Sequence, residues 1–330
     1  MAGEIGIIVN PMSGRDVRRV AARASTQSHH DKQQQVTRLV LGALAHGASR
    51  IFLANEPFRI NTRAIENLPE RDKVEILDFP LTHRSQDTVT MTNIMWDHGC
   101  RTFIVIGGDG TNRIVAETKP DAAVLPVSTG TNNVFPFMVE GTVAGAAAGI
   151  IASGLLDYTD VCLRCKQVHV NVGDVHHLAL VDAVLLRKDL LGSLLPFDPD
   201  NIAAVFLALS EPASIGMSPI GGFLMPSHHN DDFGVRIITG KPAIHRIHVP
   251  VSAGLYGDIA IASLGHMTFD QEVPLEGPGI LAFDGDRVLR LNDGESATVT
   301  IRRDGPWVID PRVVLETAAR RGLLATEENP

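Results

Sequence analysis

The chain has 330 residues, which at ~150 residues per domain predicts about two domains. Hydrophobic residues make up 44% of it and charged residues 20%, a composition that excludes wholesale disorder. Its formal charge of −9 and its 5% of aromatic residues exclude a dedicated nucleic-acid-binding protein, which needs a basic face and aromatic side chains for base stacking.

The terminus and the cysteines indicate a cytoplasmic protein. The first residues, MAGEIGIIVNP, contain an acid and no basic stretch, so they do not form a signal peptide. The most lipid-like stretch, Val143–Leu156, is too short to span a bilayer. The cysteines Cys100, Cys162 and Cys165 cannot build a disulfide framework, which fits a reducing compartment. We therefore expect a cytoplasmic protein that binds neither membranes nor nucleic acids.

The first half of the chain alternates short apolar runs with helical stripes. The apolar runs predict buried strands at Ile5–Val9, Ile51–Ala54, Val74–Leu77, Thr102–Ile106 and Ala123–Val127. Apolar residues at helical spacing predict helices over residues 17–24, 36–47, 91–98 and 142–152. Strands that alternate with helices need right-handed crossovers and form a parallel sheet. We expect an α/β domain over residues 1–155, with a doubly wound, mostly parallel sheet.

The pattern changes after about Leu155. Short alternating runs such as VRIITG, DIAIASLG and ATVTIRR follow one another, separated by Gly, Asp and Asn. This pattern predicts an antiparallel β-sandwich domain over residues 156–330. Helices are expected only over Pro199–Ser210 and, at the C-terminal end, over Pro311–Arg321. No flexible linker separates the two halves, so we expect a ligand site in the cleft between them.

The segment Val105–Glu117 carries the sharpest functional signal, a strand followed by the turn GGDGT and a helix start. Gly107, Gly108 and Gly110 let the backbone approach a ligand, and the N–H groups at the helix start favour an anion. Asp109 is unexpected there, because a carboxylate repels phosphate. It makes sense if it holds Mg²⁺ or accepts a proton from an attacking hydroxyl. The alternative is a plain turn in which this Asp caps the helix.

Two further polar loops follow strands that should end at the same edge of the sheet. Residues 10–14 (NPMSG) offer a hydroxyl and a flexible glycine, and residues 128–133 (STGTNN) offer hydroxyls and amides to phosphates or a ribose. Arg15 and Arg113 adjoin two of these loops and are candidate phosphate contacts. A dinucleotide G-x-G-x-x-G, a Walker loop and a G-x-S-x-G elbow do not occur in the sequence. The three loops together predict a phosphate site.

The negative net charge does not oppose a phosphate ligand, because residues 1–40 hold six Lys or Arg and three Asp or Glu. The histidine pairs at 29–30, 176–177 and 228–229 have side chains that point apart on a strand or helix. Each pair therefore supplies at most one metal ligand, and we do not expect these pairs to bind metal.

The motifs NPMSG, IGGDGT and VSTGTNN, in this order and spacing, resemble the superfamily that joins diacylglycerol kinases, sphingosine kinases and NAD kinases. The stretches GIIVNPMSGRD, VDAVLLRKD, PASIGMSPIGG, AFDGDR and RRDGPWVID are similar to its ATP-NAD/AcoX kinase-like family, named for acetoin catabolism protein X. The resemblance covers essentially the whole chain. It implies an ATP-dependent kinase with an α/β domain followed by a β-sandwich.

The resemblance also implies roles for individual residues. Asp109 would be the catalytic residue that acts on the acceptor hydroxyl, and Asp284 of the FDGD turn would lie near the metal. Contacts to ATP and the acceptor would come from Asn10, Ser13, Gly14, Gly107, Gly108, Gly110, Thr111, Thr131, Asn132, Asn133 and Asp182. Val181 precedes Asp182 where NAD kinases carry Asn, and their GSTAY stretch is matched only loosely by residues 214–218. The acceptor half therefore departs from the NAD kinase pattern.

We expect a kinase that uses ATP and Mg²⁺ to phosphorylate a hydroxyl of NAD or another small metabolite. Either Asp109 or Asp284 would hold the metal. With an ordinary pKa of about 3.9, Asp109 would orient the hydroxyl more than deprotonate it. Two alternatives stay open, a kinase for a small ketol or polyol linked to acetoin catabolism and a non-catalytic nucleotide-binding regulator. An exposed strand edge in the second domain would favour a homo-oligomer.

Overall fold

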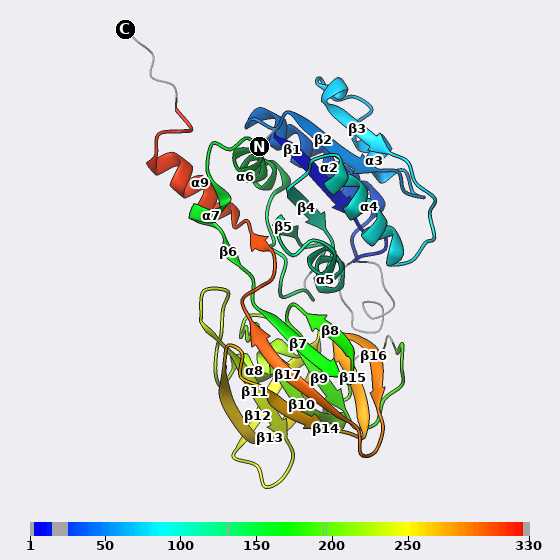
Figure 1. The fold of residues 1–330 in the computed structure, drawn as a ribbon, viewed down its shortest axis with the longest axis vertical. Helices are drawn as coiled ribbons and strands as arrows, with labels where there is room; N and C mark the ends of the chain where they lie inside the picture. The colour runs from blue at the N-terminus through cyan, green and yellow to red at the C-terminus, as the bar shows by residue number, and fades with distance from the viewer. Residues whose placement is uncertain (1–2, 15–25, 131, 194, 196, 326–330) are drawn as a thin grey trace.

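The computed structural model describes residues 3–14, 26–130, 132–193, 195 and 197–325. They form an α/β unit and a β-sandwich, which lie one above the other in Figure 1. The helix expected over residues 17–24, the candidate phosphate contact Arg15 and the expected site residue Thr131 lie outside the described residues.

The α/β unit is built on a sheet with strand order β3-β2-β1-β4-β5-β18-β6. Its elements from the first half of the chain are β1 (Glu4–Val9), α2 (His29–Ala45), β2 (Arg50–Ala54), α3 (Ile60–Ala64), η1 (Arg71–Lys73), β3 (Val74–Leu77), α4 (Gln86–Asp97), β4 (Thr102–Ile106), α5 (Asp109–Thr118), β5 (Ala123–Val127) and α6 (Gly141–Ala152). Strand β1 pairs in parallel with both β2 and β4. The chain therefore reverses its direction of winding at β1, and the loops after β1 and β4 meet at the carboxyl edge.

Helices cover both faces of this sheet, which confirms the expected doubly wound architecture (Figure 1). Helices α2 and α6 pack on one face over a core that includes Ile7 and Ile104. Helices α4 and α5 pack on the other face, over Phe103 and Ile8. The strands read as unbroken apolar runs because both of their faces are buried.

The Ala- and Gly-rich stretch forms α6, which lies directly against α2. A Cβ atom on Gly42 of α2 would lie 2.2 Å from the carbonyl oxygen of Thr142, and one on Gly145 would lie 2.2 Å from that of Leu39. The two backbones can approach this closely because glycine has no side chain. No helix in the described residues is long and apolar enough to cross a membrane.

The β-sandwich packs a sheet with strand order β12-β13-β11-β10-β9-β15-β16 against a sheet with order β14-β17-β7-β8. Its strands are β7 (Gln167–Val172), β8 (Val175–Ala179), β9 (Asp182–Leu186), β10 (Ile202–Leu207), β11 (Phe233–Thr239), β12 (His245–Ser252), β13 (Leu255–Thr268), β14 (Val273–Glu276), β15 (Gly279–Phe283), β16 (Asp286–Leu291) and β17 (Ser296–Arg302). A short helix, α8 (Ser218–Gly222), covers β11 and β12 on the outer face. The antiparallel sandwich expected from the sequence is confirmed.

The helix expected over Pro199–Ser210 is wrong. Pro199–Asn201 forms one 3₁₀ turn, η2, and the following strand β10 lies between β9 and β11. The run IAAVFL suits a helix by local propensity, but both of its faces are buried, with Phe206 in the core between the sheets and Val205 in the core on the outer face. Pairing with two neighbouring strands overrides the local preference.

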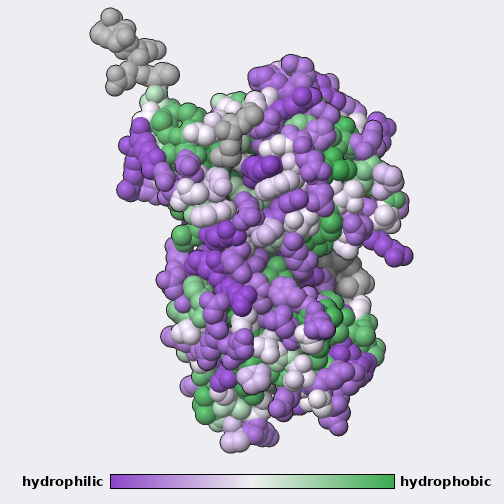
Figure 2. Space-filling view, viewed as in Figure 1, coloured by the Kyte–Doolittle hydropathy of each residue, from purple (hydrophilic) through white to green (hydrophobic). Residues whose placement is uncertain are grey.

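The last part of the chain returns to the α/β unit. Strands β6 (Leu163–Arg164) and β18 (Trp307–Val308) extend its sheet, with β18 parallel to β5 and antiparallel to β6. Helix α9 (Pro311–Arg320), which was expected at this place, packs against α6 and α7 (Tyr158–Val161). Residues 156–330 thus contribute to both units, and the face shown in Figure 2 is mostly hydrophilic over both.

Candidate functional site

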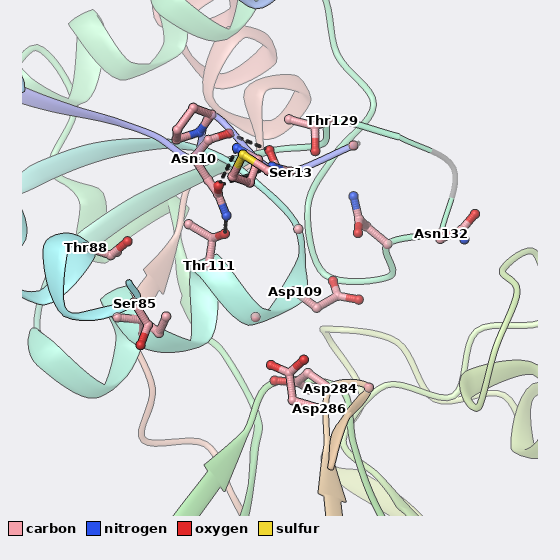
Figure 3. A pocket seen from close by; sticks show the side chains of 18 of the residues that line it. Asn10, Ser13, Ser85, Thr88, Asp109, Thr111, Thr129, Asn132, Asp284 and Asp286 are labelled. Carbon is pink, nitrogen blue, oxygen red and sulfur yellow. Dashed lines mark hydrogen bonds between the residues drawn. The ribbon is translucent and has the colours of Figure 1, made fainter. Parts of the chain in front are cut away.

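Three polar loops meet at the carboxyl edge of the α/β sheet, where strands β1, β4 and β5 end. They line one side of a cavity of about 850 Å³, and residues of the β-sandwich line the other side. Figure 3 shows Asn10, Asp109 and Asn132 on the first side and Asp284 and Asp286 facing them. The sequence predicted this convergence of loops from their positions after neighbouring parallel strands.

The loop after β1 is held in a fixed shape by its own side chains. Asn10 Oδ1 accepts hydrogen bonds from the backbone N–H groups of Met12 (2.9 Å) and Ser13 (3.2 Å). Asn10 Nδ2 donates to Thr111 Oγ1 (2.9 Å) in helix α5, and Ser13 Oγ donates to the Asn10 carbonyl (2.8 Å) (Figure 3). Asn10 therefore joins the first loop to the GGDGT segment.

Lys32 of α2, which was not identified from the sequence, holds the same loop through hydrogen bonds from the helix side. Its side chain is fully buried, and Nζ donates to the carbonyl oxygens of Asn10 (2.8 Å), Pro11 (2.8 Å) and Ser13 (2.6 Å). These bonds turn the carbonyl groups of the loop towards α2 and away from the cavity. The available signal was a lysine at helical spacing from the apolar positions Val36 and Leu39.

The glycines of GGDGT serve two different purposes. A Cβ on Gly108 would lie 2.8 Å from Asn133 Oδ1, and one on Gly110 would lie 3.3 Å from Asp286 Oδ2. Both glycines line the cavity. Gly107 does not: a Cβ there would lie 2.6 Å from the Cβ of Thr111, so this glycine lets helix α5 pack against its own strand.

The loop after β5 places amides and a hydroxyl at the cavity. Asn133 Nδ2 donates to Ser128 Oγ (2.9 Å), and Asn132 and Thr129 also line the wall. Thr129 Oγ1 is buried and has no hydrogen-bond partner among the described residues. A buried polar atom without a partner costs free energy, so this hydroxyl indicates a ligand that completes the site.

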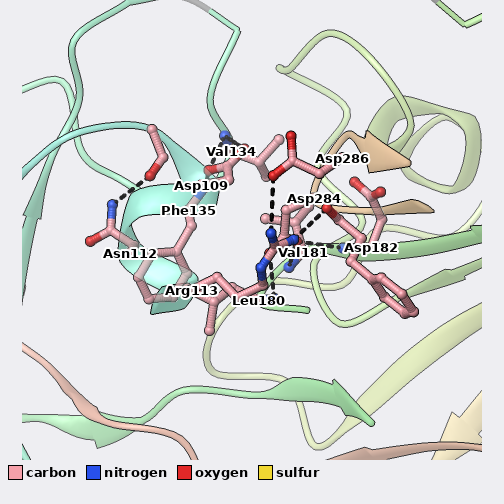
Figure 4. Close-up of polar contacts among 12 residues, drawn as sticks. Asp109, Asn112, Arg113, Val134, Phe135, Leu180, Val181, Asp182, Asp284 and Asp286 are labelled. Atoms are coloured by element: carbon pink, nitrogen blue, oxygen red, sulfur yellow. Dashed lines mark hydrogen bonds and ion pairs between the residues drawn. The ribbon is translucent and has the colours of Figure 1, made fainter. Parts of the chain in front are cut away.

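Asp109 is the first residue of α5, and this half-buried residue lines the cavity at the junction of the two units. Its Oδ1 accepts hydrogen bonds from the backbone N–H groups of Phe135 (2.9 Å) and Val134 (3.1 Å) (Figure 4). Burial, reinforced by the negative charge of Asp284, raises the pKa of Asp109 to about 7. This differs from the ordinary value expected from the sequence, and it makes the carboxylate a better base.

Asp284 lies in the FDGD turn, where the backbone has φ of +46°, and its side chain is fully buried. It accepts hydrogen bonds from the backbone N–H groups of Leu180 (3.0 Å), Val181 (2.8 Å) and Asp182 (3.3 Å), as Figure 4 shows in part. The carboxylate therefore ties the turn after β15 to the start of β9. Most of its acceptor capacity is used inside the protein.

Asp182 also lines the cavity, whereas the preceding Val181 does not. Its carboxyl is buried, and Oδ1 has no hydrogen-bond partner among the described residues. Burial and the nearby carboxylates of Asp284 and Asp109 raise the pKa of Asp182 well above its usual value. Asp182 and Thr129 thus bring buried polar atoms without partners to opposite sides of the same cavity.

Arg113, which was expected to contact phosphate, instead forms ion pairs that join the two units. Its guanidinium lies 3.0 Å from Asp286 Oδ2 and 3.7 Å from Asp284 Oδ2, and it donates to the Phe283 carbonyl. Arg113 does not line the cavity. The carboxylates of the FDGD turn pair with this arginine and hold it away from the cavity. This contact joins segments far apart in the chain, so the residues next to Arg113 in the sequence do not predict it.

Two family models match the chain, the ATP-NAD kinase N-terminal domain over residues 5–155 and the acetoin catabolism protein X C-terminal domain over residues 166–304. A protein from Cupriavidus necator, acetoin catabolism protein X, is 30% identical to this chain over 345 residues. That alignment covers 100% of this chain and 96% of the relative.

Two solved structures are similar to the whole chain at low identity. One is a candidate diacylglycerol kinase from Bacillus anthracis, with 14% identity and a TM-score of 0.47, and the match covers 94% of this chain and 99% of the other. The second is an NAD kinase from Archaeoglobus fulgidus in complex with ATP, with 10% identity and a TM-score of 0.41, and this match covers 98% and 100%.

Proposed function

Because the chain belongs to the ATP-NAD/AcoX kinase-like family, we propose that it transfers the γ-phosphoryl group of ATP to a hydroxyl of a small molecule. One observation carries the proposal. A half-buried carboxylate with a raised pKa, Asp109, lies where three polar loops meet a wall from the other unit, all around one cavity of about 850 Å³. A positioned base beside a phosphate site is what phosphoryl transfer to an alcohol needs.

The ATP phosphates would lie against the loops of the α/β unit. Helix α5 begins at the cavity, and the partial positive charge of its N-terminus favours an anion. Gly14 and Gly108 expose backbone to the cavity, and the buried Thr129 Oγ1 offers a hydrogen bond that none of the described residues makes. These features support a bound nucleotide.

The residues present suit Mg²⁺ that arrives with the nucleotide. No three His, Cys, Asp or Glu residues in the described part of the chain are arranged to hold a metal by themselves. Mg²⁺ commonly keeps several waters and binds one or two carboxylates together with substrate phosphates. Asp286, which lines the cavity, is the candidate for such a carboxylate, in preference to the internally bonded Asp284 and to Asp109, which the transfer needs as a base. When bound, the ion would neutralise charge on the phosphates.

Asp109 would hold the acceptor hydroxyl and take its proton. The acceptor oxygen forms a bond to the γ-phosphorus while the bond from that phosphorus to the β–γ bridging oxygen breaks, and ADP leaves. The hydroxyl proton passes to the Asp109 carboxylate. Because burial raises the pKa of Asp109 to about 7, the group can act as a base near neutral pH as well as orient the hydroxyl.

The acceptor would bind between Asp109 and the β-sandwich wall. NAD is one candidate, given the ATP-NAD kinase model that matches residues 5–155. A small ketol or polyol is another, given the name of the Cupriavidus relative. The apolar Val181 stands where NAD kinases carry Asn, which weakens the case for NAD.

The test is ADP release from Mg·ATP with NAD, NADH, acetoin, glycerol, sugars and diacylglycerol as acceptors, with Asp109→Asn as the inactive control. Acceptor-dependent ADP release by the wild type supports the kinase. ATP binding without ADP release on any acceptor overturns it and favours a nucleotide-binding regulator.

A further inference from the structure

The side of the cavity that faces Asp109 bears on the chemical class of the acceptor, and the inference rests on the proposed function. The β-sandwich contributes a group of apolar side chains to this wall, from Leu195, Phe197, Ile215, Met217 and Val251. A wall of this composition binds a ligand by burying its carbon skeleton. The exposed side chain of Leu195, 63% accessible, is available to be covered by a ligand.

The same wall has no spare positive charge among its described residues, and the other arginine that lines the cavity, Arg84, belongs to the α/β unit. The cation of the wall is Arg287, whose Nε lies 3.1 Å from Asp189 Oδ2 and whose Nη1 donates to the Ser193 carbonyl (3.0 Å). The guanidinium also lies 4.1 Å from the centre of the Phe197 ring, and the side chain is 1% exposed. Arg287 therefore shapes the loop that carries Leu195 and does not reach out to an anion.

Carboxyl groups occupy the polar part of this wall. Asp182, Asp284 and Asp286 belong to it, and Asp109 lies opposite. These carboxyl groups already repel one another, so an anionic group brought between them adds negative charge where it is disfavoured. The buried Asp182 Oδ1, in contrast, lacks a hydrogen-bond partner among the described residues and would be satisfied by an uncharged polar group.

We propose that the acceptor is a small, uncharged aliphatic alcohol with a second oxygen, and not a dinucleotide or another anion. The reacting hydroxyl lies at Asp109, the second oxygen forms a hydrogen bond with Asp182, and the carbon skeleton packs against the apolar wall. The transfer is the one described above, in which the alcohol gives its proton to Asp109 and ATP supplies the phosphoryl group.

A matched pair of acceptors tests the charge class directly. Propane-1,2-diol and lactate share a three-carbon skeleton and a secondary hydroxyl, but lactate carries a carboxylate in place of the second alcohol. ADP release from Mg·ATP is measured with each, and with NAD. We expect kcat/KM for the diol to exceed that for lactate and for NAD by at least about tenfold. Equal or better use of lactate or NAD by the wild type overturns the inference and leaves the kinase standing.

Two lysine substitutions on one loop test whether this wall determines the preference for an uncharged acceptor over an anionic one. Leu195→Lys places a cation in the wall at an exposed position, and it should shift the diol-to-lactate ratio of kcat/KM towards lactate by at least about fivefold. Leu190→Lys is the control, since Leu190 lies on the same loop, is 71% exposed and does not line the cavity. Its ratio should equal that of the wild type. Equal ratios for the two variants contradict the assignment of the wall.

A binding experiment tests the acceptor class independently of whether the protein has kinase activity. Ligand-observed NMR saturation transfer detects weak binding of propane-1,2-diol and lactate to the wild type in the presence of Mg²⁺ and a non-hydrolysable ATP analogue. Transfer to the diol and none to lactate supports the acceptor class even if no acceptor turns over. Transfer to lactate, with or without transfer to the diol, overturns it, and so does transfer to neither ligand.

Discussion

The ammonium group of Lys32 lies 2.6 Å from the carbonyl oxygen of Ser13, beneath the first loop of the cavity. Two further carbonyl groups of this loop, those of Asn10 and Pro11, accept from the same nitrogen. A buried side chain from one helix thus determines the shape of a loop that the sequence alone marks only as a flexible turn.

We expect Lys32→Met to lower the free energy of unfolding by about 1–3 kcal/mol, because it leaves three half-buried carbonyl groups of the loop without this donor. The KM for ATP should rise as the loop loses its shape. Urea denaturation and an ATP titration measure the two effects. Gln34→Met, at an exposed position of the same helix, is the control and should change neither quantity. Unchanged ATP binding in Lys32→Met would show that the loop does not depend on this lysine.

Activity should depend on pH through Asp109. Only its ionised form accepts a proton, and its pKa is raised to about 7, so kcat/KM should rise with pH through that region. Below it, kcat/KM should fall roughly tenfold per pH unit. A profile of ADP release against pH, at saturating Mg·ATP, measures the effect. A profile that stays flat from pH 5 to pH 8, on the order of three units across this pKa, rules out the base role.

Asp109→Asn should lower kcat by about 10²–10⁴-fold with little change in ATP affinity, because the amide cannot take the proton. The variant should nevertheless be at least as stable as the wild type at pH 8. The pKa in the folded protein, about 7, lies above the ordinary value of 3.8 for an aspartate, so the charge of Asp109 opposes folding once the pH rises above 3.8. Thermal denaturation at pH 8 checks the sign, and a large loss of stability would contradict it.

The free energy of unfolding should depend more on Arg113, which joins the two units, than on its exposed partner Asp286. Arg113→Leu leaves the fully buried Asp284 without its counter-charge, and we expect a loss of about 3–5 kcal/mol in the free energy of unfolding. Asp286→Asn removes a partner that is 40% exposed and should cost about 0–1 kcal/mol. Urea denaturation compares them, and similar losses would mean that Asp284 does not need the arginine.

Gly14→Ala should weaken ATP binding. Gly14 has φ of +72°, and a Cβ there would lie 2.7 Å from the Thr129 carbonyl oxygen, so the first and third loops would have to separate. Gly154→Ala is the matched control, since Gly154 has φ of +78° and open space around its Cβ position. Both variants bear the cost of left-handed backbone, about 1–2 kcal/mol, but only Gly14→Ala should raise the Kd for ATP. Equal effects on ATP binding would contradict the clash.

The spacing of apolar residues predicted helices and strands correctly wherever local pattern and tertiary environment agree. Strands β4 and β5 have the predicted bounds, and α6 begins one residue before its predicted start. It failed at residues 199–210, where an alanine-rich run pairs with two distant strands. Periodicity also missed the return of β18 and α9 to the first sheet, because strand pairing across the chain leaves no local signal.

Motifs and apolar periodicity were enough to identify the family, the alternation of strands and helices, and the three loops that meet, since parallel strands bring their carboxyl ends to one edge. What each group at that edge can do depends on the folded environment. The tertiary structure used Arg113 and Asp284 in contacts between distant segments, placed Lys32 beneath the first loop, and raised the pKa of Asp109 by burial beside another carboxylate. Those properties depend on desolvation and on charges far apart in the chain, and both exist only after folding.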